Sequence, residues 1–472
     1  MRKTKIICTM GPAVDDDGLI EKLMKSGMDC ARFNFSHGTH AEQKERMDRV
    51  KRVREKLKLP IAMMLDTKGP EIRVRNFAGG SAHVVDGSEF TFDTKEELPG
   101  DNTRVALSYH ELAKWVKPGA LILLDDGKIS MEVDRIEEEK IICKVTHGGK
   151  LSNHKSINIP GTSIPMPYIS EVDKSDVLFG IEQGVDFVAA SFVRNVDDVK
   201  AMRKLLNEHG GSAIKIIAKI ENREGLDNFD EILPYTEGVM VARGDLGVEI
   251  PFSEIPSIQK ELIQKCIHAG VFVITATQML ESMTHSPRPT RAEVSDVANA
   301  IYDGTSIIML SGETAAGEFP VEAVRTMAEI AEKAESTIDY EKKFKQTDLM
   351  LTKSILDSTC VAACSAAQYV DAKAIVTVSK TGRTAARLSD FYPSCPIIAG
   401  IVSETGRRQM NTAFSVKPLE AKELKSVDEL VDYARSIALK SKIVKRGDTI
   451  VIVTGSRKNI EHSSDTMKIM VL

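Results

Sequence analysis

The chain has 472 residues, which is too long for one compact hydrophobic core and predicts about two to four domains. Lys and Arg number 63 against 68 Asp and Glu, so the formal net charge of −5 lacks the basic excess typical of proteins that bind nucleic acid or a membrane surface. Hydrophobic residues at 42% and charged residues at 28% are ordinary globular values, which fit an enzyme that acts on small molecules.

The seven cysteines are expected to be reduced thiols. They have no C-x-x-C spacing, and most lie in apolar runs, where a free cysteine packs as a small core residue. The N-terminal apolar run Ile6–Cys8 is too short for a signal peptide, and no stretch approaches the ~20 apolar residues of a membrane span. We therefore expect a cytoplasmic protein that binds neither nucleic acid nor membranes.

Short apolar runs alternate with helical patterns eight times along the chain. Strands are expected at Thr4–Met10, Met28–Phe35, Ile61–Asp66, Val185–Val193, Ile214–Glu221, Gly238–Arg243, Val271–Thr277 and Ser306–Leu310. Apolar strands separated by helices indicate a parallel sheet covered on both faces. Eight such units suit a closed (β/α)₈ barrel. An open doubly wound sheet is the alternative, and polar residues after nearly every strand favour the barrel.

A segment from about Pro70 to Pro167 interrupts the alternation after the third strand. It contains short strand patterns with little helical periodicity, which predict a small all-β module. These are Glu89–Phe92, Ala120–Leu124, Ile129–Val133 and Ile141–Val145. The insertion point places the module over the barrel end where barrel active sites lie, so we expect a lid.

After about Tyr340 the pattern starts again. A helix is expected at Ile355–Tyr369, followed by strands at Ala374–Val378, Ile397–Ile401, Ser415–Leu419, Thr449–Thr454 and Lys468–Leu472. This predicts a separate α/β domain with an open, mostly parallel sheet. The expected domains are a barrel of residues 1–69 and 168–340, a lid of residues 70–167 and a C-terminal domain of residues 341–472.

Polar side chains follow the second and third strands. Arg32, Asn34 and Ser36 alternate and so point the same way, which indicates an anion or cation site. The alternative is a strand-to-helix turn in which Ser36 or His37 caps the next helix. Asp66 and Thr67 offer oxygen ligands to a hard cation, although the Gly-Pro turn that follows them accounts for part of this pattern.

The fifth and sixth strands end in charged residues. Lys219 and Glu221 lie two apart on one face, where a buried pair is a poor stabilising device. Asp245 follows one barrel unit later, and neighbouring strands lie about 4.8 Å apart, so both carboxylates can hold one Mg²⁺. Thr277, after the seventh strand, either contacts a ligand or satisfies backbone groups. These residue types indicate phosphoryl or carboxylate chemistry on a divalent metal and do not name the substrate.

At these residues the sequence resembles the pyruvate kinase family. The similar segments, in the family's order, are ARFNFSHG (31–38), LDTKGPEIR (65–73), IIAKIENREGL (216–226), MVARGDLGVEI (240–250), TQMLESM (277–283) and SGET (311–314). The resemblance covers the whole chain and implies transfer of the phosphoryl group of phosphoenolpyruvate to ADP, giving pyruvate and ATP, in glycolysis. Because the chain ends at Leu472, it is expected to lack the phosphohistidine-like domain that some bacterial members append.

The resemblance also implies residue roles. Glu221 and Asp245 resemble the Mg²⁺ ligands, Lys219 the lysine that neutralises the transferring phosphoryl group, and Arg32 the phosphate-binding arginine. The K⁺ site is matched by Asn34, Ser36, Asp66 and Thr67, and Glu71 is similar to the residue of K⁺-requiring members. A second Mg²⁺ is expected to arrive with ADP.

Further implied roles concern the substrate and the nucleotide. Thr277 resembles the residue implicated in protonating the enolate, through water. The backbone of Ala242, Arg243, Gly244 and Asp245 is expected to hold the pyruvate carboxylate. Arg73 and Asn34 resemble phosphate and nucleotide contacts. Ala316 stands where many members carry a lysine near the nucleotide, so Lys155 of the lid is a further candidate.

An effector site is predicted in the C-terminal domain. Hydroxyls, a glycine and two bases stand at a helix start, which is the composition of a phosphate cradle: Ser379, Lys380, Thr381, Gly382, Arg383 and Thr384. An ordinary helix cap explains the hydroxyls but not both cations, and residues 455–458 are expected to complete the site. The family resemblance implies a sugar-phosphate effector and a homotetramer. A Mg²⁺-dependent pyruvate aldolase and a non-enzymatic sugar-phosphate sensor are the rival interpretations.

Overall fold

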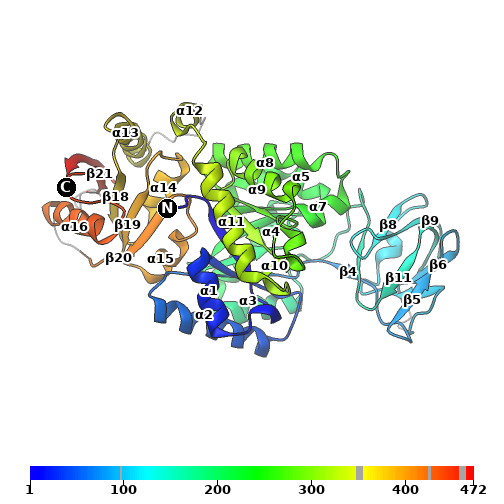
Figure 1. The fold of residues 1–472 in the computed structure, drawn as a ribbon. Coiled ribbons are helices and arrows are strands. Elements are labelled where there is room, and N and C mark those ends of the chain that lie inside the picture. The colour runs from blue at the N-terminus through cyan, green and yellow to red at the C-terminus, as the bar shows by residue number, and fades with distance from the viewer. Residues whose placement is uncertain (96–97, 347–353, 424–426, 456–463) are drawn as a thin grey trace.

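The computed structural model describes residues 1–95, 98–346, 354–423, 427–455 and 464–472. Eight parallel strands close into a barrel at the centre of the molecule, in the order β1-β17-β16-β15-β14-β13-β3-β2 (Figure 1). They are β1 (Lys5–Thr9), β2 (Cys30–Asn34), β3 (Ala62–Asp66), β13 (Phe187–Ala190), β14 (Lys215–Ile220), β15 (Gly238–Ala242), β16 (Phe272–Ala276) and β17 (Ile307–Leu310). The predicted barrel is confirmed, and the open-sheet alternative is wrong.

Helices cover the outside of the barrel. They are α1 (Asp17–Ser26), α2 (His40–Leu57), α3 (Glu171–Gln183), α4 (Val196–Glu208), α5 (Arg223–Asp227), α6 (Phe229–Ile232), α7 (Arg243–Glu249), α8 (Ile255–Ala269), α9 (Arg291–Asp303), α10 (Gly312–Ala315) and α11 (Pro320–Glu335). Thr39 caps α2 in a capping box with Glu42, so the cap predicted at Ser36 or His37 is wrong. Alternate strand residues such as Met64, Ile217 and Met240 fill the barrel interior.

The lid is an all-β module inserted after β3. Its strands are β4 (Ile72–Arg73), β5 (Ser81–Val84), β6 (Glu89–Asp93), β7 (Arg104–Ala106), β8 (Leu121–Leu124), β9 (Ile129–Glu137), β10 (Lys140–His147), β11 (Gly149–Ser152) and β12 (Ser156–Asn158). Seven of them form one sheet, and β11 pairs with β5. The four predicted strands are present, and each of the five lid strands that the sequence did not predict has only two to four residues, too few for an alternating pattern to reveal.

The C-terminal domain carries an open sheet in the order β20-β19-β18-β21-β22. Its strands are β18 (Ala374–Ser379), β19 (Ile397–Ile401), β20 (Val416–Glu420), β21 (Thr449–Thr454) and β22 (Thr466–Val471), and only β22 runs antiparallel to its neighbour. Its helices are α13 (Ile355–Tyr369), α14 (Arg383–Asp390), α15 (Glu404–Met410) and α16 (Val427–Lys440), and α12 (Tyr340–Gln346) precedes them. The predicted sheet type is confirmed, whereas the exact domain boundaries stay predictions.

The barrel and the C-terminal domain are joined through buried polar contacts. The ion pair between Arg408 of α15 and Asp186, at the start of β13, has an Nε–Oδ1 distance of 2.9 Å. The N-terminal segment lies at the same junction (Figure 1), where the amide of Ser415 donates to the carbonyl of Lys3 at 2.9 Å. Of the described helices, none has the length and apolar character needed to cross a membrane.

Candidate active site

A cavity of about 260 Å³ lies between the carboxyl ends of the barrel strands and the lid. It brings together many of the residues that the sequence singled out. Those lining it are Arg32, Asn34, Ser36, Thr67, Arg73, Lys155, Lys219, Glu221 and Asp245. The site lies at the end of the barrel where barrel enzymes carry their chemistry.

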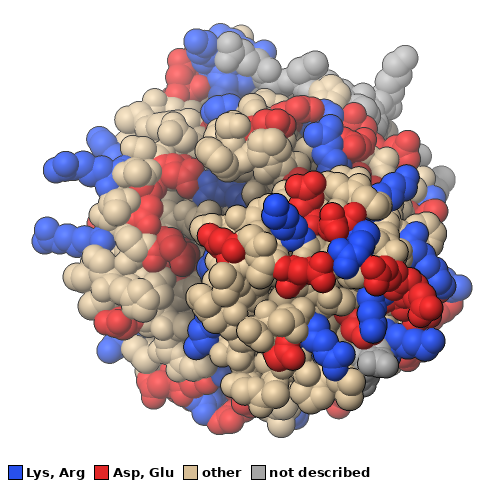
Figure 2. Space-filling model, turned by 90° about the vertical axis from the view of Figure 1, so that its right-hand side faces the viewer, with Lys and Arg blue, Asp and Glu red and all other residues tan. Residues whose placement is uncertain are grey.

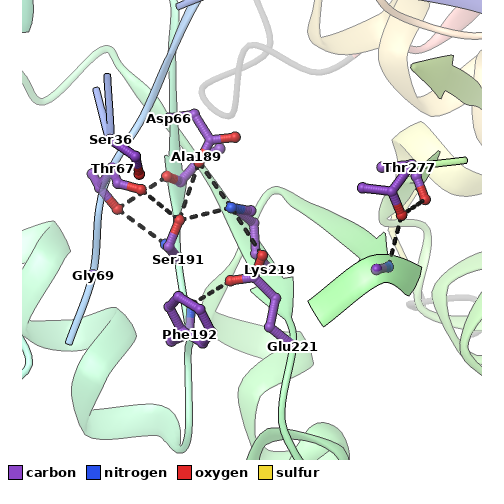
Figure 3. A network of polar contacts seen from close by, with 12 residues as sticks. Ser36, Asp66, Thr67, Gly69, Ala189, Ser191, Phe192, Lys219, Glu221 and Thr277 are labelled. Carbon is purple, nitrogen blue, oxygen red and sulfur yellow. Dashed lines mark hydrogen bonds and ion pairs between the residues drawn. The ribbon is translucent and has the colours of Figure 1, made fainter. Parts of the chain in front are cut away.

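Lys219 is the centre of the polar network at the floor of this cavity (Figure 3). Its ammonium lies 2.9 Å from Oδ1 of Asp66 and 2.9 Å from Oε1 of Glu221. It also donates to Oγ of Ser191 at 2.8 Å. The three side chains come from β3 and the ends of β13 and β14, which are neighbours in the barrel, so closure of the sheet is what assembles the network.

Arg32 brings a second cation to the same carboxylate. Its Nε lies 2.6 Å from Oδ2 of Asp66, and its Nη1 donates to Oγ1 of Thr9 at 2.9 Å. The register pairs Asn34 of β2 with Asp66 of β3. Asp66 itself has no exposed surface, so it serves both cations from beneath the cavity floor.

Sequence analysis missed Ser191 and Phe192, because the strand predicted at Val185–Val193 ends at Ala190. Ser191 donates to the carbonyl of Thr67 at 2.6 Å as well as contacting Lys219. Phe192 has a positive φ of 52°, which turns its amide toward Oε2 of Glu221 at 2.7 Å. A hydroxyl at the end of a barrel strand was the one available signal for Ser191.

Three charged groups of the site, one lysine and two carboxyls, have shifted pKa values. Burial would lower the pKa of Lys219, but Asp66 and Glu221 outweigh it and raise that pKa above its usual value. Burial raises the pKa of Glu221 to about 7, because Lys219 only partly offsets it and Asp245 and Asp66 repel its charge. Burial also raises the pKa of Asp245. The site therefore holds a cation that stays charged beside two carboxylates that resist charging together.

Glu221 and Asp245 fit a divalent cation. Burial raises the pKa of both carboxyl groups, and the charge of Asp245 raises the pKa of Glu221 further, so a cation between them would remove their repulsion. Within the described ranges, no group of three or more His, Cys, Asp or Glu side chains has the arrangement of a metal site. Two carboxylates, with substrate and water completing the shell, are a usual way for proteins to hold Mg²⁺.

Thr277 and Arg243 lie apart from the cavity floor. The Oγ1 of Thr277 accepts from the amide of Gly244 at 2.8 Å and donates to the carbonyl of Ala276 at 2.6 Å, and Figure 3 shows it separated from the lysine network. Arg243 was predicted as the end of a strand, but it is the first residue of α7. Its guanidinium pairs with Asp296 at 2.8 Å and donates to the carbonyl of Thr277 at 2.6 Å, so it connects the ends of β15 and β16.

The lid contributes two charged pairs to the cavity. Nη2 of Arg73 lies 2.6 Å from Oε2 of Glu71, and Nη1 donates to the carbonyl of His154 at 2.7 Å. Nζ of Lys155 lies 2.6 Å from Oδ1 of Asp125. Both cations of the lid therefore have partners that an incoming anion would have to replace.

The predicted effector loop connects β18 to α14. Gly382 has a positive φ of 94° at the start of α14, and its amide donates to Oγ of Ser379 at 3.0 Å. Lys380, Thr381 and Arg383 are exposed, whereas Thr384 is buried and its hydroxyl bonds that of Ser464 at 2.7 Å. Of the residues predicted to complete the site, 456–458 lie outside the described ranges.

The surface at the lid end carries mixed charges. Figure 2 shows Lys and Arg interspersed with Asp and Glu over this face, with basic side chains at the bottom of a hollow. Interspersed charges of this kind are unlike the continuous basic stripe of a nucleic-acid site.

The fold and the site together define a barrel enzyme with a cavity of charged side chains beneath its lid. The model of the pyruvate kinase barrel domain matches residues 1–324, and the model of the pyruvate kinase alpha/beta domain matches residues 357–470. Similar proteins include the pyruvate kinase of Clostridium perfringens, 46% identical over 99% of both chains, and that of Clostridium acetobutylicum, 46% identical over 100% of both. A solved pyruvate kinase from Cryptosporidium parvum has a TM-score of 0.94 and 37% identity, covering 100% of this chain and 96% of that one.

The chain therefore belongs to the pyruvate kinase family. It is a phosphotransferase, and the aldolase and sensor interpretations lose their support.

Proposed function

We propose that the cavity between barrel and lid transfers the phosphoryl group of phosphoenolpyruvate to ADP. The proposal rests on the position of Lys219, whose ammonium lies between Asp66 and Glu221 at the cavity floor. An ammonium fixed by two acids and one hydroxyl cannot move away as charge develops on a phosphoryl group. Such preorganisation is the main source of catalysis in phosphoryl transfer.

Glu221 and Asp245 would hold the Mg²⁺, with a second ion arriving on ADP. When bound, the metal neutralises charge on phosphate and enolate oxygens. The chain's own part is to orient the substrate: Arg32 and Lys219 present two cations to the phosphoryl group from adjoining parts of the floor. The P–O bond to the enol oxygen breaks, a P–O bond to ADP forms, and the enolate takes up a proton at C3.

The carboxylate of the substrate is assigned to the backbone of residues 242–245. Support comes from the start of α7, where the first amides of a helix have no intrahelical partner. The amide of Gly244 is bonded to Thr277, so substrate binding there would exchange that partner. The contact between Thr277 and this amide supports the role proposed for Thr277 in enolate protonation through water.

K⁺ is assigned to Asn34, Ser36, Asp66 and Thr67. The support is that these oxygens come from the ends of the paired strands β2 and β3 and that three of the four residues line the cavity. Glu71, the residue similar to that of K⁺-requiring members, is held by Arg73. Arg73, Asn34 and Lys155 are assigned to the nucleotide, with the lid cations leaving Glu71 and Asp125 as phosphate enters.

The loop of residues 379–384 is assigned to a sugar-phosphate effector. Exposed Lys380 and Arg383 flank the start of α14, which supports anion binding there. We propose that the enzyme is a cytoplasmic homotetramer, as the family resemblance implies.

A coupled assay tests the proposal. Purified protein with phosphoenolpyruvate and ADP should form pyruvate, measured by NADH oxidation through lactate dehydrogenase, only when Mg²⁺ is present and faster with K⁺ than with Na⁺. Glu221→Gln should remove Mg²⁺-dependent turnover, whereas Glu231→Gln, an exposed acid on α6, should leave it intact. Metal-independent turnover, or equal activity of the two variants, would overturn the metal assignment. An unchanged half-saturation for phosphoenolpyruvate with each sugar phosphate tested would remove the effector assignment.

A further inference from the structure

A second, larger cavity lies at the junction of the barrel and the C-terminal domain, on the side away from the lid. It has a volume of about 900 Å³ and is bounded by the N-terminal segment, by α1 and α11, by the end of α2 and by β20. Seven Lys and Arg side chains line it against three carboxylates, Asp29, Glu329 and Glu332. Seven minus three leaves four positive charges in one cavity of a chain whose formal net charge is −5.

Lys5 is the deepest of these cations. It is only 5% exposed, and its ammonium makes one hydrogen bond, to the carbonyl of Val416 at 2.7 Å. Burial lowers its pKa, and Arg2 and Lys417 repel its charge. A lysine ammonium has three donors, so two N–H groups here have no partner in the part of the chain that the structure describes.

The nearest acid is already in use. Asp29 favours the charged form of Lys5, but its carboxylate pairs with Arg2 and accepts from the amide of Ile6 at 2.9 Å. A buried charge with a single neutral acceptor is expensive unless a counter-ion is supplied. Asp29 is therefore satisfied by Arg2, whereas Lys5 has only a neutral acceptor among the described residues.

Three more cations stand free at the rim. Lys22 of α1, Lys58 after α2 and Arg325 of α11 are exposed, and none takes part in an ion pair with any described residue. By contrast, Lys25, which also lines the cavity, and Lys56 of α2 are both paired with Glu21. Oppositely charged pairs on a helix surface lie three or four residues apart on the same helix. The three cations here come from separate elements and line one cavity without such partners.

We propose that this junction cavity binds a small phosphorylated metabolite carrying at least two anionic groups, one placed against Lys5 and the other held by Lys22, Lys58 and Arg325 at the rim. Phosphate suits both positions because its oxygens accept several N–H bonds at once. The cavity is separate from the loop of residues 379–384 and from the active site, with which it shares no lining residue. Because it spans β1 and β20, its ligand would contact the barrel and the C-terminal domain together.

Calorimetric titration with inorganic pyrophosphate tests the proposal on the full-length protein, in low salt with EDTA so that no metal is present. Lys22→Ala/Arg325→Ala should weaken binding about tenfold or more, since two phosphate contacts are lost. The matched control Lys174→Ala/Lys333→Ala removes the same charge from exposed positions of α3 and α11 that line neither cavity and should bind like wild type. Turnover without pyrophosphate should be the same in all three proteins.

Lysine acetylation read by mass spectrometry gives a second readout. Pyrophosphate should protect Lys22 and Lys58 while leaving Lys333 reactive. Equal affinity of the two double variants would overturn the proposal, and so would saturation without protection of Lys22. Loss of binding in Lys380→Ala, with Lys22→Ala/Arg325→Ala unaffected, would place the anion on the 379–384 loop and also refute it.

Discussion

Replacing Lys219 by methionine tests the arrangement on which the active site depends. The side chains are similar in length, so the substitution removes the charge and hydrogen bonds with little change in volume. A cation that stabilises a transferring phosphoryl group is worth about 10³–10⁵-fold in turnover, or about 4–7 kcal/mol. We expect kcat to fall by about this factor with phosphoenolpyruvate and ADP in the coupled assay.

The same substitution has a structural cost that must be measured separately. Asp66 and Glu221 each lose an ammonium at 2.9 Å, and removing one partner of a buried pair costs about 3–5 kcal/mol. Asp66 keeps Arg32 and Glu221 keeps the amide of Phe192, so the variant should fold with a lowered Tm.

Lys215→Met is the matched control. It removes a lysine from the opposite end of the same strand, where no described residue forms an ion pair with it, and it should retain normal turnover. Mn²⁺ binding, followed by electron paramagnetic resonance, should remain detectable in Lys219→Met. A folded Lys219→Met protein with near-normal kcat would refute the role assigned to this lysine.

Other substitutions have expected outcomes that rest on the same contacts. Arg194 pairs with Asp198 of α4 and donates to two main-chain carbonyls of the segment that returns from the lid. Arg194→Ala should therefore speed hydrogen exchange of the amides in that segment and lower kcat/KM. Unchanged exchange would contradict the role of Arg194 as an anchor. Arg408→Met leaves Asp186 buried without its cation and should cost about 3–5 kcal/mol in urea unfolding, whereas a neutral result would show that the pair does not join the domains. Burial raises the pKa of Asp390 to about 7 in the folded protein. Between the pKa of the unfolded chain and pH 7, the folded protein therefore carries a proton on this carboxyl that the unfolded chain does not. The free energy of unfolding falls as pH rises through that range. Asp390→Asn should therefore raise Tm at pH 8 and have little effect near pH 4, and equal Tm changes at both pH values would contradict the shifted pKa.

The sequence predicted the architecture well because strand and helix patterns are local. Apolar runs such as Ile397–Ile401 and Thr449–Thr454 appear as strands with the same bounds, and Ile355–Tyr369 as a helix with the same bounds. The lid was predicted with only four strands, since its remaining short strands exist only through pairing with neighbours. Likewise Val185–Val193 was too long as a strand, because an apolar run does not reveal where the backbone turns.

What the sequence by itself determined was the set of strand-end residues, including Lys219, Glu221 and Asp245, because the carboxyl ends of parallel strands must meet at one end of a barrel. Only the tertiary structure decided which side chains touch. Ser191 contacts Lys219, Arg243 begins helix α7 instead of ending a strand, and Lys5 is buried with a single acceptor. Those outcomes depend on turn geometry and on packing between distant segments. Neither is encoded in the spacing of residues along one strand.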